Sequence, residues 1–177
     1  MDAGVVTEQQ SIHNGGATAE DLEELYRARL DVFVRVAAAI TGDRDSARDA
    51  VHDAFAASLR DLAAFRREAA LESWVWTAVV NSARNQRRGR RRRLRHEDPA
   101  ATPEATATAV PPLDPEIRAM VAALPERQRL MLFLRYFADL DYATIGAVTG
   151  VSTGTVSATL SAAHSALRTA METGGHR

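Results

Sequence analysis

A proline-rich stretch separates this chain into two halves. Between His96 and Pro115 the residues are mainly proline, alanine, threonine and acids, and five of them are prolines. Proline has no amide hydrogen to donate and interrupts helices and central strands, so this composition is typical of a linker. Each half of the 177 residues is long enough for a small helical domain. The sequence therefore predicts two small domains joined by a flexible linker.

The first half has apolar residues at the spacing of amphipathic helices. We expect one helix to start at Thr18 or Glu20 and to stop at Gly42, because glycine favours the end of a helix. Asp43 or Asp45 is expected to cap a second helix, since a carboxylate there can accept from free backbone amides.

A third helix is expected after a short loop over residues 65–72. Ser73 is expected to cap this helix, which continues to about Arg88. The arginines that follow show no apolar period, so we expect the helix to fray there. The first domain is accordingly placed at residues 18–95 and the linker at residues 96–113.

The second half predicts four further helices, the last two forming a helix-turn-helix. A proline follows Asp114 at the start of one helix, and Pro125 starts the next. Asp141 is expected to cap a short helix that ends at Gly150, and Ser152 to cap a longer last helix. A short helix, a glycine-containing turn and a longer helix are the pattern of a helix-turn-helix.

The composition agrees with an all-α fold. Hydrophobic residues make up 46% of the chain but aromatic residues only 6%, which favours helices over a β-sandwich.

The second domain is placed at residues 114–171 with a tail at 172–177, and residues 1–17 are expected to be a disordered leader. No apolar run approaches the roughly 20 residues of a membrane span, so we expect a cytoplasmic protein without membrane insertion.

The net charge of -1 conceals a strong separation of charge along the chain. Residues 84–95 hold eight arginines and no acid, whereas residues 20–72 hold twelve acids against eight arginines. Such a separation suits a protein that meets nucleic acid with one surface and a basic protein with another. The chain has neither cysteine nor lysine, which excludes disulfides, thiolate metal sites and catalytic lysines.

The third predicted helix carries a polar face that suits DNA. At about 100° per residue, its hydroxyl, amide and guanidinium groups fall on one side and its apolar residues on the other. Asn and Arg are side chains that read base edges and phosphates. The alternative is a face that only meets solvent, which Glu and Lys would more often fill. The residues of this face are Thr77, Asn81, Arg84, Asn85 and Arg88.

An aromatic residue in the preceding loop stands beside two arginines. Phe65 falls outside the apolar stripes, with Arg66 and Arg67 next to it. An exposed aromatic ring beside arginines can stack on an unpaired base. The alternative is a Phe65 side chain that folds back and closes the three-helix core.

In this order, the motifs of the chain resemble those of the extracytoplasmic-function (ECF) sigma factors of bacterial RNA polymerase. The second conserved region of that family is similar to DAVHDAF at residues 49–55, FRR at 65–67 and WVWTAVVNSARN at 74–85. The fourth region is similar to LPERQR, LRYF, LDYATIG and VSTGTV, which begin at residues 124, 134, 140 and 151. Each motif alone is common, whereas the ordered set is specific.

The resemblance implies a factor that carries core RNA polymerase to promoter DNA, needs no cofactor or metal, and is not an enzyme. It also implies an anti-sigma protein as a partner. Docking on the clamp helices of the polymerase β′ subunit would involve Asp49, His52, Asp53 and Phe55. Melting and reading of the −10 promoter element would involve Phe65, Arg66, Arg67, Thr77, Asn81, Arg84, Asn85 and Arg88. The second domain would bind the polymerase β-flap and read the −35 element through Thr153, Thr155, Ser157, Ala158, Ser161, Ala162 and His164.

Two features depart from the family's pattern. His52 stands where Gln is usual, a mild change because His also donates and accepts hydrogen bonds. The last helix lacks the usual Lys or Arg, and no arginine occurs between Arg135 and Arg168. Few phosphate contacts imply a weak electrostatic affinity for the −35 element.

Two alternatives to a sigma factor differ in kind from it. The His52-Asp53 pair is similar to ligands of metal phosphohydrolases, but the remaining histidines outside the last helix lie in segments expected to be disordered. The closer alternative is an adaptor that holds polymerase or an anti-sigma protein without reading a −35 sequence, and the arginine-free last helix favours it. Runoff transcription separates an adaptor from a sigma factor.

Overall fold

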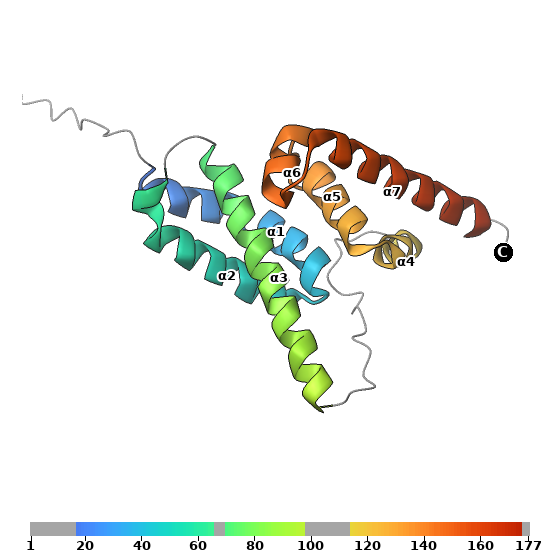
Figure 1. Cartoon of the computed structure of the whole chain (residues 1–177), viewed down its shortest axis with the longest axis horizontal. Helices are drawn as coiled ribbons and strands as arrows, with labels where there is room; N and C mark the ends of the chain where they lie inside the picture. The colour runs from blue at the N-terminus through green and yellow to red at the C-terminus, as the bar shows by residue number, and fades with distance from the viewer. Residues whose placement is uncertain (1–16, 66–69, 98–113, 175–177) are drawn as a thin grey trace, which may run out of the picture.

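The computed structural model describes residues 17–65, 70–97 and 114–174, which form α-helices, one short 3-10 helix and their connections (Figure 1). Two groups of helices pack side by side, α1 to α3 and α4 to α7 (Figure 1). We call them the first and the second bundle. This arrangement confirms the predicted all-α fold with two helical domains. None of the helices in the described ranges is long and apolar enough to cross a membrane.

Helix α1 (Ala19–Thr41) begins and ends where its sequence predicts. The Thr18 hydroxyl accepts a hydrogen bond from the Asp21 amide at 3.1 Å, and the Asp21 carboxylate accepts from the Thr18 amide at 2.8 Å. This reciprocal pair satisfies amides that have no partner inside the helix. Gly42 ends the helix with a φ of 90°, in the left-handed region that favours glycine.

Helix α2 (Arg44–Arg60) runs back along α1 and is followed by the 3-10 turn η1 (Leu62–Ala64). The Asp43 carboxylate accepts from the Ser46 amide at 2.7 Å, so the prediction that an aspartate caps this helix is confirmed at Asp43.

Helix α3 (Leu71–Glu97) is longer than predicted at both ends. It starts before Ser73 and continues as helix through the arginine run, so the predicted cap at Ser73 and the predicted fraying near Arg88 are wrong. Arginine is a strong helix former, which the apolar period alone did not reveal. The Arg90 guanidinium also pairs with the Asp43 carboxylate at 2.6 Å and ties the run to the start of α2.

A column of aromatic rings fills the core of the first bundle. The Trp76 and Phe33 ring centroids are 4.2 Å apart, and the Phe33 and Phe55 centroids are 5.2 Å apart. Tyr26 continues the column at 5.0 Å from Phe55. Edge-on and tilted contacts of this kind add to the free energy gained by burying the rings. This core fixes α3 with its apolar side inward and its polar side outward.

The second bundle consists of α4 (Pro115–Ala123), α5 (Glu126–Tyr136), α6 (Tyr142–Thr149) and α7 (Thr153–Gly174). Helices α6 and α7 are the predicted helix-turn-helix, and both pack on α5. The prediction of four helices in this half is confirmed.

Local chemistry fixes the turn between α6 and α7. The Asp141 carboxylate accepts from the Thr144 amide at 2.7 Å and caps α6, and Gly150 ends it with a φ of 73°. The Ser152 hydroxyl accepts from the Thr155 amide at 3.2 Å at the start of α7. The predicted roles of Asp141, Gly150 and Ser152 are therefore confirmed.

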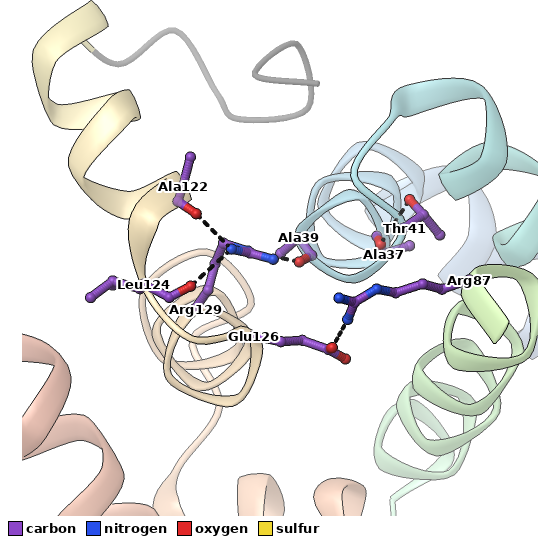
Figure 2. Close-up of polar contacts among 8 residues, drawn as sticks. All are labelled: Ala37, Ala39, Thr41, Arg87, Ala122, Leu124, Glu126 and Arg129. Carbon is purple, nitrogen blue, oxygen red and sulfur yellow. Dashed lines mark hydrogen bonds and ion pairs between the residues drawn. The ribbon is translucent and has the colours of Figure 1, made fainter. Parts of the chain in front are cut away.

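The two bundles also contact each other, which the sequence did not predict. Helix α5 packs against α1, and α6 packs against α3. Figure 2 shows Arg129 of α5 reaching the carbonyl oxygen of Ala39 on α1. The buried side chains of both bundles form one continuous cluster among the described residues.

Candidate nucleic-acid interface

Helix α3 presents an amide and guanidinium surface to solvent. Asn81, Asn85 and Arg88 are exposed, whereas Thr77 and Arg84 are half-buried. An Arg88 nitrogen donates to the Asn85 side-chain oxygen at 2.5 Å, so these two side chains hold each other in place. The Asn81 amide has both polar ends available, which suits the reading of a base edge.

A hollow of about 580 Å³ lies between α2 and α3 beside this surface. Asn81, Asn85 and Asp53 line it, and the Gln86 amide donates to the Asp53 carboxylate at 3.2 Å across it. The structure thus brings a residue predicted to bind polymerase next to residues predicted to read DNA. The amides that line the hollow offer both donors and acceptors.

Arginines from both bundles build a positive field at one side of α3. Burial lowers the pKa of the Arg84 guanidinium, and the like charges of Arg88 and Arg127 lower it further. Burial also lowers the pKa of Arg87, as do the charges of Arg91 and Arg129. Mutual repulsion of this kind marks a surface where an anion is favoured.

The Phe65 ring is neither fully exposed nor folded into the core, the two alternatives considered for it. Its side chain is half-buried, and its ring centroid is 5.3 Å from that of Trp74 at the start of α3. The ring therefore rests at the edge of the first bundle and keeps part of its surface in solvent. Arg66 and Arg67 lie outside the described residues.

The predicted polymerase residues on α2 fall into two groups. Asp49, His52 and Asp53 are exposed, whereas Phe55 is buried against Tyr26 and Phe33. Phe55 thus positions the exposed residues of α2 rather than standing among them.

The recognition helix α7 exposes small polar and apolar side chains. Thr155 is half-buried, and its hydroxyl lies 2.9 Å from that of Ser152. His164 is also half-buried, with its Nε2 atom 2.9 Å from the Tyr136 hydroxyl on α5. The predicted −35 residues that are exposed are Thr153, Ser157, Ala158, Ser161 and Ala162.

The structure adds one cation that sequence reasoning missed. Arg127 of α5 lines an open groove of about 660 Å³ together with Ser152, Thr155, Ala158 and Ala162. Counting arginines along α7 overlooked it, because the packing of α5 on α7 brings it there. The only signal in the sequence is its place in the first turn of the helix after Pro125. A guanidinium at this point can meet a phosphate.

The enzyme alternative finds no support among the described residues. No three His, Asp or Glu side chains in these ranges gather into a group that could hold a metal ion. The exposed His52 ring lies beside the Tyr26 ring, with the two centroids 6.2 Å apart.

A basic polar helix surface joined to a helix-turn-helix is the architecture of a promoter-binding factor. Residues 25–93 match sigma-70 region 2, and residues 115–167 match sigma-70 region 4. Together these matches span more than half of the chain. The chain belongs to the sigma-70 family, and the direct succession of regions 2 and 4 is the organisation of its ECF type. Members of this family direct transcription initiation and are not enzymes, which confirms both predictions.

Two solved structures of similar fold are both complexes with a partner protein. The sigma factor RpoE in complex with the anti-sigma factor NepR from Bartonella quintana is 22% identical, with a TM-score of 0.67 over 85% of this chain and 98% of that chain. CnrH in complex with the cytosolic domain of CnrY is 16% identical, with a TM-score of 0.65 over 89% of this chain and 91% of that chain. No curated protein sequence matches the chain significantly.

Proposed function

We propose that this sigma factor reads the −10 promoter element with the exposed face of α3 and contacts the −35 element with α7. The observation that carries the proposal is the exposed amide of Asn81 beside Asn85 and the arginines of α3. Amides pair with base edges and guanidinium groups with phosphates, so one surface can both read and hold DNA.

Contact with the −35 element rests on a small set of groups. The exposed hydroxyls of α7 can donate to bases or phosphates but carry no charge. Arg127 is the cation that lies in the groove beside them. We therefore expect a modest electrostatic contribution from the second bundle and a larger one from the arginines of α3.

The polymerase is proposed to bind the exposed acids of α2. Asp49 and Asp53 carry charge toward solvent, which suits a basic or polar surface on the partner. Core polymerase works on DNA in the bacterial cytoplasm, so the factor is expected to act there. The similar sigma factor RpoE forms a complex with the anti-sigma factor NepR, and we propose that an anti-sigma protein also holds this chain.

Runoff transcription with core polymerase tests the function and separates it from the adaptor alternative. Asn81→Ala should lower open-complex formation roughly tenfold, because one base contact is lost, while binding to polymerase is unchanged. Permanganate reactivity at −10 measures the melting. Thr169→Ala, which removes an exposed hydroxyl on α7 outside the groove that Arg127 lines, is the matched control. Equal reactivity for Asn81→Ala and the unsubstituted chain would exclude α3 as the reader.

A charge reversal tests the polymerase surface separately. Asp49→Arg with Asp53→Arg should abolish co-purification with core polymerase, because both contacts become repulsive. Glu24→Arg with Asp31→Arg makes the same change of charge on the exposed side of α1 and should leave co-purification intact. Retention of polymerase by the α2 variant at low salt would show that the enzyme docks elsewhere.

A further inference from the structure

The helix-turn-helix lacks the side chains that usually read guanine, adenine and cytosine. Guanine is usually read by Arg or Lys, adenine by Asn or Gln, and cytosine by Asp or Glu. Residues 142–167, which span α6 and most of α7, contain none of these six residue types. Any direct reading of bases by α7 therefore uses other groups.

The remaining polar groups along α7 discriminate poorly between bases. Ser and Thr hydroxyls both donate and accept, so they can pair with any base. The Thr159 hydroxyl is also engaged within the helix, because it donates to the Thr155 carbonyl oxygen at 2.7 Å. The Thr155 hydroxyl lies 2.9 Å from that of Ser152. The hydroxyls that line the groove beside α7 are thus largely occupied by partners in the protein.

Two further polar side chains near α7 are poorly placed to read a base from this groove. Gln128 of α5 lines the groove, but its Oε1 atom is buried, so a base edge cannot meet both ends of the amide. His164 follows Ala162 by two residues and therefore projects from the other side of α7. There its Nε2 atom lies 2.9 Å from the Tyr136 hydroxyl.

The groove offers methyl groups instead. Ala158 and Ala162 lie four residues apart on one side of α7, and both are exposed along this open groove of about 660 Å³. Side chains this small also allow a close approach. An α-helix with ordinary side chains is about 10–12 Å across and fills a major groove about 12 Å wide. The backbone of α7 can therefore come nearer to the base edges than that of a helix with long side chains.

Thymine is the base that presents an apolar group in the major groove, the methyl group on its C5 atom. We propose that Ala158 and Ala162 recognise thymine C5-methyl groups in the −35 element, so that apolar contact selects this element. The inference rests on the proposed contact of α7 with −35 DNA. Arg127 in the same groove holds a phosphate, which fixes the position of the helix but reads no sequence.

A pool of duplexes with random sequence upstream of a start site identifies the elements that the factor uses. The full chain with core polymerase transcribes the pool, and the transcribed members are sequenced. Ala158 and Ala162 are about 6 Å apart along the helix axis, which is about two base-pair steps. The recovered −35 elements should therefore carry thymines at one or two neighbouring positions.

Deoxyuridine tests the methyl group itself, because it differs from thymidine only by the absence of that group. Deoxyuridine at the selected −35 thymines should raise the holoenzyme concentration for half-maximal transcription about fourfold for each methyl removed. Deoxyuridine between the two elements is the matched control and should have no effect. At the same −35 positions, 5-methylcytosine should act at about fourfold lower concentration than cytosine, because it restores the methyl group without the thymine O4 atom.

A substitution in the protein assigns the contact to α7. Ala158→Ser with Ala162→Ser places a hydroxyl on each methyl at exposed positions and should bring the ratio between thymine and deoxyuridine promoters close to one. Ala166→Ser makes the same change at an exposed position outside the groove and should preserve the ratio. An effect of deoxyuridine on DNA shape alone would persist in the double serine variant.

The outcomes separate this inference from the proposed function. Transcription of the pool with no preferred base at −35, or with equal use of thymine and deoxyuridine, would overturn the reading of methyl groups alone. A ratio that survives in the double serine variant would overturn the assignment to Ala158 and Ala162. A pool from which no member is transcribed would overturn the proposed function, and this inference with it.

Discussion

Gly146 lies where α6 passes closest to the turn before α7. The Val151 amide donates to the Gly146 carbonyl oxygen at 2.9 Å, and a Cβ atom at Gly146 would lie 2.7 Å from the Val151 carbonyl oxygen. Neither backbone group can move without opening the turn. The absence of a side chain is therefore what allows α7 to leave α6 at this angle.

Gly146→Ala should lower the free energy of unfolding by about 1–3 kcal/mol, because the added methyl group overpacks the turn. Gly154→Ala is the matched control, since a Cβ atom there meets only the Ser152 hydroxyl at 3.9 Å. Alanine at 154 should stabilise the chain by roughly 0.5–1 kcal/mol. Urea unfolding of both variants measures the difference. Equal midpoints would contradict the close approach at Gly146.

Single residues whose partners are near in sequence were predictable. Thr18, Asp43 and Asp141 cap helices through amides three residues further on, and that chemistry is legible in the sequence. The contact made by Arg129 was not predictable, because its partner Ala39 lies 90 residues away in the sequence. No local pattern distinguishes it from Arg127, two positions earlier, which faces the groove beside α7 instead.

At the scale of the element, the apolar period predicted where the helices lie but gave too short a length for α3. The arginine run has no apolar stripe, yet α3 continues through it to Glu97. Its continuation depends on helix propensity and on Arg90 meeting Asp43, a contact between α3 and the start of α2. The apolar period predicted which residues lie on the polar face of α3. It could not predict the hollow between α3 and α2, because that hollow depends on how the two helices pack.

Helix α6 is short and depends on its cap, which makes it sensitive to acid. The backbone hydrogen bond from Thr144 holds the pKa of Asp141 below its ordinary value of 3.8. A depressed pKa in the folded state contributes stability above the ordinary pKa, and this stability is lost as pH falls through the folded pKa. The effect is therefore confined to pH below about 4.

Asp141→Ala should lower the melting temperature at pH 7 and reduce the further fall between pH 4 and pH 2. Asp141→Ser keeps an oxygen for the Thr144 amide but does not titrate, so it should retain stability at pH 7 with the same reduced fall. Thermal unfolding at several pH values compares the three chains. A pH dependence in the serine variant as large as that of aspartate would assign the titration to another group.

A cation placed on α7 should raise the weak electrostatic affinity of this helix for DNA phosphates. Ala162 is exposed and lines the groove that Arg127 occupies. Ala162→Arg should strengthen binding of the full chain to a duplex with a −35 element and steepen the salt dependence of log K by about 0.9. Met171→Arg adds the same charge at an exposed position nine residues further along, on the opposite side of α7, and is the control. The same gain from both variants, or none from Ala162→Arg, would show that this side of α7 does not face DNA.

At the scale of the whole molecule, composition predicted two domains but said nothing of their contact. The proline-rich stretch indicates a linker between two folded parts. A linker is compatible both with bundles that lie apart and with bundles that pack together. The links that join them connect Arg29 to Ala138 and Arg129 to Ala39, across separations of 109 and 90 residues. Only the folded surfaces of both bundles decide such contacts.

The length of the connection should set how often the bundles meet. Closure is an intramolecular binding event, so its effective concentration falls as about the −3/2 power of the connecting length. An insertion of about twenty Gly and Ser residues in the middle of residues 98–113 should therefore lower the ratio of closed to open chains about threefold. A control with the sequence of 98–113 shuffled at constant length should keep the original ratio. Spin labels on Ala56→Cys of α2 and Ser165→Cys of α7, both exposed in a chain without other cysteines, report the ratio in both chains, while the melting temperature of each bundle should stay constant. An unchanged distance distribution after the insertion would mean that the bundles form a single permanent unit, and DNA reading at two distant elements would then require a different explanation.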